Sequence, residues 1–139
     1  MDYQAFLREL ETHALPAADF DHRAHLLAAW AYRSRYPARE AAARCAHTLS
    51  RYAMAHGAAE KYHHTLTMAL LAIMYSRLDA QPCQQASWDD FLAANADLMA
   101  DSRAIVARHY SEQRLQHHDA RRAFVAPDLA PLPMSCLLH

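Results

Sequence analysis

Residues 59–78, AEKYHHTLTMALLAIMYSRL, decide the fold of this 139-residue chain. Apolar side chains recur there at helical spacing, and no proline or glycine interrupts the stretch. They form one wide stripe made of Leu66, Ala69, Leu70, Ile73 and Met74, which Leu71 and Leu78 broaden. A helix that is apolar over so much of its surface packs inside a protein. We expect it to be the most buried helix of an all-α fold.

Two helices are predicted near the N-terminus. The first covers residues 2–13 and ends before Pro16. The second starts near Asp19 or Asp21, because an aspartate there can accept hydrogen bonds from unpaired backbone N–H groups. Pro37 ends this second helix, since the residue before a proline is biased away from helical geometry.

Further helices are predicted on both sides of the apolar stretch. A third helix over 38–56 follows a proline that suits its first turn, and Gly57 closes it as a C-terminal cap. A capping signal at 87–90, SWDD, starts a fifth helix. Apolar pairs at helical spacing in 102–110 and a further turn around 120–125 complete the pattern.

The C-terminal stretch 126–139, APDLAPLPMSCLLH, contains three prolines and cannot be regular helix. Its leucines are too apolar for a freely solvated end, so we expect it to lie along the rest of the protein. The chain length fits one domain, and no internal repeat is found. The sequence therefore predicts a compact single-domain bundle of about five to six helices over 1–125, with an extended tail packed on it.

Composition excludes several classes of function. Charged residues make up 21% of the chain and the net charge is -1, so there is no strong positive field for nucleic acid. No apolar run reaches the roughly 18 residues of a membrane span. Cys45, Cys83 and Cys136 form no CxxC pair, and no signal-peptide pattern precedes them, which favours a reducing cytoplasm. We expect no nucleotide cofactor, nucleic-acid partner or membrane insertion.

Eleven histidines are the most informative feature of the composition. His139 is terminal, and His117 and His118 lie in a polar segment that is expected to be exposed, so these three are the least informative. His22 and His25 are three residues apart on the second predicted helix. This spacing places two imidazoles about one turn apart on one side of a helix, where both can face one point.

His63 falls inside the apolar stripe of residues 59–78, whereas His64 is turned roughly 100° away from it. A buried imidazole needs partners for two ring nitrogens. Tyr62, Thr65 and Thr67 are available for this purpose. The position of His63 therefore predicts a polar site in an apolar interior.

These histidines predict a metal site between helices, with His22, His25 and His63 as ligands and His109 or His64 completing the shell. Imidazoles that converge from different helices suit zinc, copper, iron or nickel. An open coordination position would make such a site catalytic. Around the ligands, as hydrogen-bonding or cofactor-binding neighbours, we expect Tyr62, Thr65 and Thr67.

Four stretches carry a resemblance to a known group of proteins. They are FDHRAHL at 20–26, KYHHTLT at 61–67, HYS at 109–111 and PDLAPLP at 127–133. Together they resemble a group of small uncharacterised bacterial helical proteins with FxHxxHL and KYHxTxT motifs. Those proteins often carry a glutamate where this chain has His64. The resemblance implies a bacterial source and implies no particular activity; it directs attention to His22, His25, Tyr62, His63, Thr65 and Thr67.

The leading hypothesis is a metal-binding protein, with a small metal-dependent enzyme as one form of it. The alternative is a non-enzymatic helical module that binds a small apolar ligand or a partner protein, with histidines that only support the fold. A third hypothesis is an acid–base enzyme without a metal, because imidazoles titrate near neutral pH. Homodimerisation through an apolar face or the leucine-rich tail is compatible with each of them.

Overall fold

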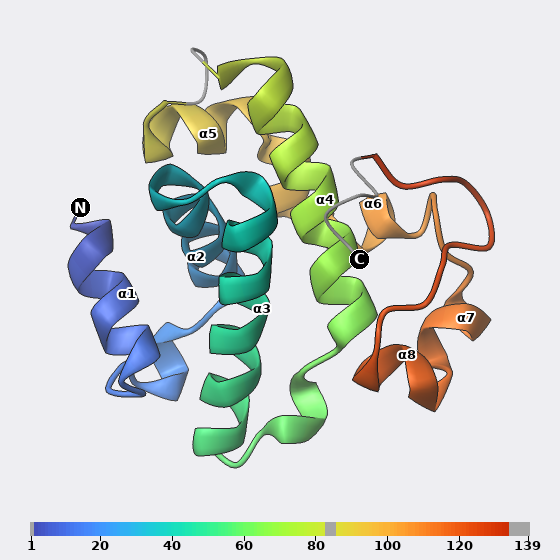
Figure 1. Ribbon diagram of the computed structural model, residues 1–139, viewed down its shortest axis with the longest axis horizontal. Coiled ribbons are helices and arrows are strands. Elements are labelled where there is room, and N and C mark those ends of the chain that lie inside the picture. The colour runs from blue at the N-terminus through green and yellow to red at the C-terminus, as the bar shows by residue number, and fades with distance from the viewer. Residues whose placement is uncertain (1, 83–85, 134–139) are drawn as a thin grey trace. The chain divides into compact units, whose positions relative to one another are not determined.

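The computed structural model describes residues 2–82 and 86–133 (Figure 1). Helix makes up 72% of the structure, and the described residues contain no strand, which confirms the all-α prediction. They form eight α-helices instead of about five to six. The chain divides into two compact units, Met1–Tyr62 and His63–His139. No helix in these described stretches is long and apolar enough to cross a membrane.

Several sequence predictions concern residues outside these two stretches. Cys83, Cys136, His139 and the tail from 134 onward lie outside the described residues. The predicted boundary between a bundle over 1–125 and a packed tail stays a prediction.

The first unit consists of three packed α-helices and two short 3-10 turns. Its helices α1 (Tyr3–Glu11), α2 (His22–Arg35) and α3 (Ala38–Ala55) each contact the other two. The 3-10 turn η1 (Ala17–Asp19) lies between α1 and α2, and η2 (Ala59–Lys61) follows α3. These bounds agree with the helices predicted from the sequence to within a few residues.

Local capping explains where the helices of this unit begin and end. The Asp21 carboxylate accepts a hydrogen bond from the Ala24 N–H at 2.9 Å and so starts α2. Gly57 has a φ of +67°, and beyond it the Ala58 N–H donates to the Ala53 carbonyl at 2.8 Å. This left-handed turn at the end of α3 is the glycine cap that the sequence predicts.

A chain of hydrogen-bonded side chains joins the three helices of the first unit. Tyr32, on α2, is 2% exposed, and its hydroxyl donates to the Glu11 carboxylate at 2.8 Å. The Thr48 hydroxyl of α3 lies 2.7 Å from the Tyr32 hydroxyl oxygen and forms a second hydrogen bond with it. Loss of solvent raises the pKa of Tyr32. The phenol therefore stays neutral and serves as a fixed bridge.

The second unit is built around its longest helix. Helix α4 (His64–Ala80) contacts α6 (Ala96–Val106) and α8 (His118–Arg122). Helix α5 (Trp88–Ala94) packs on α6, and α7 (Glu112–Gln116) packs on α8. The shorter helices therefore support α4 in pairs.

Helix α4 differs in detail from the sequence prediction. It begins at His64, because residues 59–61 form the separate turn η2. Leu66 and Leu70, both expected in the buried stripe, are half-buried, whereas Met68 and Leu71 are buried. The helix is apolar nearly all round, so periodicity alone could not fix its buried face. It is also not distinctly the most buried helix, because α2 is buried to a similar extent, at Ala24 and at every residue of 26–32.

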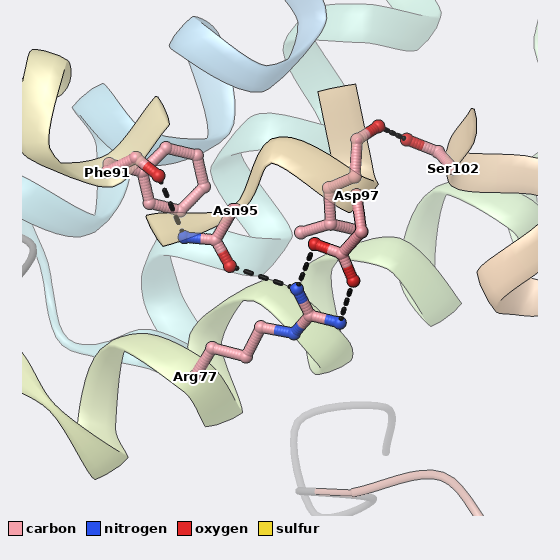
Figure 2. A network of polar contacts seen from close by, with 6 residues as sticks. Arg77, Phe91, Asn95, Asp97 and Ser102 are labelled. Atoms are coloured by element: carbon pink, nitrogen blue, oxygen red, sulfur yellow. Dashed lines mark hydrogen bonds and ion pairs between the residues drawn. The ribbon is translucent and has the colours of Figure 1, made fainter. Parts of the chain in front are cut away.

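An arginine on α4 fixes the turn between α5 and α6 (Figure 2). The Arg77 guanidinium donates to both carboxylate oxygens of Asp97, at 2.8 and 2.9 Å, and to the Asn95 side-chain oxygen at 3.1 Å. Asn95 is 2% exposed and donates to the Phe91 carbonyl at 2.9 Å. The guanidinium lowers the pKa of Asp97. This network holds the two short helices against α4.

Helix α6 is broken internally. Asp101 has a φ of -160° and a ψ of 85°, outside helical geometry. Its carboxylate accepts from the Ala104 N–H at 3.1 Å and thereby caps the second half of the helix. The Ser102 hydroxyl donates to the Leu98 carbonyl at 2.6 Å across the break (Figure 2).

The chain after α8 is extended, and side chains of the second unit hold its backbone. The Tyr110 hydroxyl donates to the Val125 carbonyl at 2.6 Å. The Arg114 Nε donates to the Ala126 carbonyl at 3.0 Å. Further along, the Ser111 hydroxyl donates to the Asp128 carboxylate at 2.6 Å. The described part of the predicted tail is therefore anchored to its own unit.

Candidate metal centre

The first predicted ligand pair, His22 and His25, lies at the start of α2 in the first unit. The His25 Nδ1 donates to the Asp21 carbonyl at 2.8 Å, and its ring stacks on Phe20 with centroids 4.0 Å apart. This bond places the proton on Nδ1 and leaves the Nε2 lone pair for another partner. Desolvation lowers the pKa of His25, and the nearby charge of His22 lowers it further, although Asp21 opposes the shift.

His63 is the N-cap residue of α4, not a member of its interior stripe. It is 8% exposed. Its Nδ1 accepts from the Leu66 N–H at 3.0 Å, and its Nε2 donates to the Leu115 carbonyl at 2.7 Å. His63 is buried, as the sequence predicts, but its ring partners are the backbone groups of Leu66 and Leu115 and not Tyr62, Thr65 or Thr67. Both ring nitrogens are bonded to backbone, so a metal at His63 would have to replace one of these bonds.

The other two predicted ligands belong to the second unit. His64 is half-buried; burial lowers its pKa, and repulsion from His63 lowers it further. His109 follows α6, where its Nδ1 donates to the Ala130 carbonyl at 3.2 Å. Its own carbonyl accepts from the Leu129 N–H at 3.0 Å. His109 therefore helps to hold the extended segment after α8.

The threonines expected around the ligands make hydrogen bonds within the second unit. The Thr65 hydroxyl donates to the Ala123 carbonyl at 2.9 Å and accepts from the Val125 N–H at 3.1 Å. The Thr67 hydroxyl donates to the His63 carbonyl at 2.8 Å. Tyr62 is half-buried at the last position of the first unit. The described contacts of both threonines are thus with the backbone.

The predicted ligand set is distributed over both units. His22 and His25 belong to the first, and His63, His64 and His109 belong to the second. That all of them share one ion stays a prediction.

A different group of side chains could hold a metal ion, namely His117, His118 and Asp119. One ligand atom from each of the three lies within 4.8 Å of the others. The His118 Nε2 is 3.0 Å from the Asp119 carboxylate, and the His117 Nδ1 is 3.7 Å from it. No other group of three or more histidines, cysteines or acidic residues in the described part of the chain is as close.

The turn between α7 and α8 brings these three side chains together. His117 has a φ of -62° and a ψ of 135°, so it ends α7 and is the N-cap of α8. Its Nδ1 accepts from the Asp119 N–H at 3.2 Å. The two imidazoles stack with centroids 4.8 Å apart and planes at 24°. Ala120, fully buried, anchors α8 directly after the cluster.

The donor set of this cluster suits a borderline first-row cation. Two imidazoles and a carboxylate match zinc, copper, nickel and ferrous iron better than magnesium or calcium, which prefer oxygen. Zinc lies about 2.0–2.2 Å from such ligands, so two donors on one ion are at most about 4.4 Å apart. The exposed side chains would therefore have to move closer together to share an ion.

Sequence reasoning placed His117 and His118 correctly in an exposed segment but gave them little weight. The low rank of these two histidines followed from the assumption that a functional histidine is buried. The signal that could have found the cluster is the run His-His-Asp between two short helices, because a capping residue points its side chain towards the residues that follow it. No protein-family model, curated protein or solved structure matches this chain.

Proposed function

We propose that this protein binds a divalent transition metal through His117, His118 and Asp119. The observation that carries the proposal is the proximity of their ligand atoms, within 4.8 Å of one another. The side chains are exposed, so an ion there displaces water and not packed protein. Two imidazoles in the set favour zinc, copper, nickel or iron over oxygen-preferring cations.

The test is zinc binding to the full chain purified without a histidine tag, measured by calorimetry and metal analysis. We expect His118→Ala and Asp119→Asn each to weaken binding by more than about tenfold, because even neighbours of metal ligands contribute that much. The matched control is His47→Ala, which removes an exposed histidine on α3. Unchanged affinity in His118→Ala, or no zinc bound by the parent chain, would overturn the proposal.

The ligand set predicted from the sequence is a second location for the same function. Within the first unit, His25 supports it, because it donates Nδ1 to a backbone carbonyl and so keeps the Nε2 lone pair for another partner. Zinc binding that is lost in His22→Ala and kept in His118→Ala would assign the ion to this set.

The second candidate function is the non-enzymatic helical module. It is favoured by His63, whose two ring nitrogens are both bonded to backbone, as expected of a histidine that supports the fold. A module of this kind would bind a small apolar ligand or a partner protein and would need no ion. If the parent chain binds no zinc and EDTA leaves its melting temperature unchanged, this function takes precedence.

A further inference from the structure

The candidate site at the α7–α8 turn supplies fewer donors than a zinc ion takes. Closed zinc sites have four protein ligands, and sites with three leave one position to another molecule. Among the residues that the structure describes, only His117, His118 and Asp119 form the group. At least one coordination position is therefore left for a donor from outside the group.

The three donor side chains are exposed at the surface of the second unit. The side chains of His117, His118 and Asp119 are 59%, 75% and 65% exposed. Sites that bind small substrates are concave and bury most of the ligand. A turn with exposed donors instead suits approach by another macromolecule, which can bring its own side chain to the ion.

We propose that a divalent transition metal at this turn joins two copies of the chain. This inference rests on the proposed function. Each copy presents the same two imidazoles and carboxylate, so a two-fold arrangement brings matched donors to the same place and completes the coordination that one copy leaves open. The partner is thus a second copy of this chain, held by the ion.

The charges around the turn make the association depend on the ion. Arg121 and Arg122 are exposed in the last turn of α8. On a helix they lie about one turn from His118 and Asp119. Two copies that meet at this turn bring like charges together, which opposes contact. Coordination bonds to a shared ion have to overcome the repulsion between these arginines, so we expect association at this surface to require the ion.

The test is the molar mass of the full, tag-free chain by sedimentation and light scattering, first with EDTA and then with one equivalent of zinc. We expect the mass to double with zinc and to return when EDTA is added. The doubling should be lost in His118→Ala and kept in His47→Ala, in which an exposed histidine far along the sequence from the turn is removed.

The outcomes separate this inference from the proposed function. Zinc bound at the turn with no change in mass would overturn the bridging and leave the binding function standing. No bound zinc would overturn both. A mass increase that His118→Ala retains would show association through another surface and would also overturn the bridging.

Discussion

Replacing His63 by alanine should destabilise the second unit strongly, because this side chain makes two hydrogen bonds to backbone. Loss of an N-cap costs about 1 kcal/mol. The Leu115 carbonyl, in a residue that is 6% exposed, would lose its donor, which costs about 1–3 kcal/mol. We therefore expect a loss of about 2–4 kcal/mol in the free energy of unfolding. His63→Asn, which can cap but is too short to bridge to Leu115, should lose less.

The assay is urea denaturation followed by fluorescence. Trp88 is the sole tryptophan of the second unit and Trp30 that of the first, so a Trp30→Phe background reports on the second unit alone. Every variant is measured with and without EDTA. A loss below about 0.5 kcal/mol in His63→Ala would refute the reasoning, since that is the range of neutral surface changes. The reasoning would also be refuted if EDTA lowered the free energy of unfolding of the parent chain by the same amount, because His63 would then act through an ion.

Three further changes test the fold locally. Gly57→Ala should lower the free energy of unfolding by about 1 kcal/mol, because φ is +67°; the added Cβ meets no atom within 4 Å, so the cost comes from the backbone alone. His13→Gly, at a φ of 66°, should instead leave the free energy of unfolding unchanged or raise it. The pKa of His25 is lowered from 6.5, so the neutral imidazole stabilises the folded state fully above pH 6.5, and this stabilisation is lost as pH falls through the folded pKa. In His25→Gln the free energy of unfolding should therefore fall less on acidification. An unchanged dependence of stability on pH in this variant would contradict the assignment. Thr65→Val removes two hydrogen bonds to residues 123–125, so their amide exchange should quicken; equal protection in both chains would contradict this.

The helix boundaries could be predicted where a few neighbouring residues decide them. Asp21 caps α2, Pro37 precedes α3 and Gly57 closes α3, all as expected. The Ser87 hydroxyl accepts from the Asp90 N–H at 3.1 Å at the start of α5, which confirms the capping signal there. Each of these interactions lies within one turn of the chain, so the sequence alone contains both partners.

Other features depend on partners that are distant in sequence, and these could not be predicted. The bond from His63 to the Leu115 carbonyl spans 52 residues, and the bond from Thr65 to the Ala123 carbonyl spans 58. A motif such as KYHxTxT shows which side chains need polar partners but not which carbonyls provide them. The break in α6 at Asp101 was missed for a different reason: its capping partner, Ala104, is only three residues away, but the apolar pattern around the aspartate conceals the capping signal.

The histidines differ in what their ring nitrogens contact, and this decides where a metal can bind at low cost. An ion needs an imidazole lone pair. At His63, which is buried, the lone pair accepts the half-buried Leu66 N–H, so a metal there would leave that donor unpaired, at a cost of up to about 1–3 kcal/mol. At His117 the corresponding bond, to the Asp119 N–H, is exposed, and water can replace it. The imidazole of His63 at the start of α4 is therefore held by the fold, whereas that of His117 at the start of α8 can exchange its hydrogen bond for a metal ion.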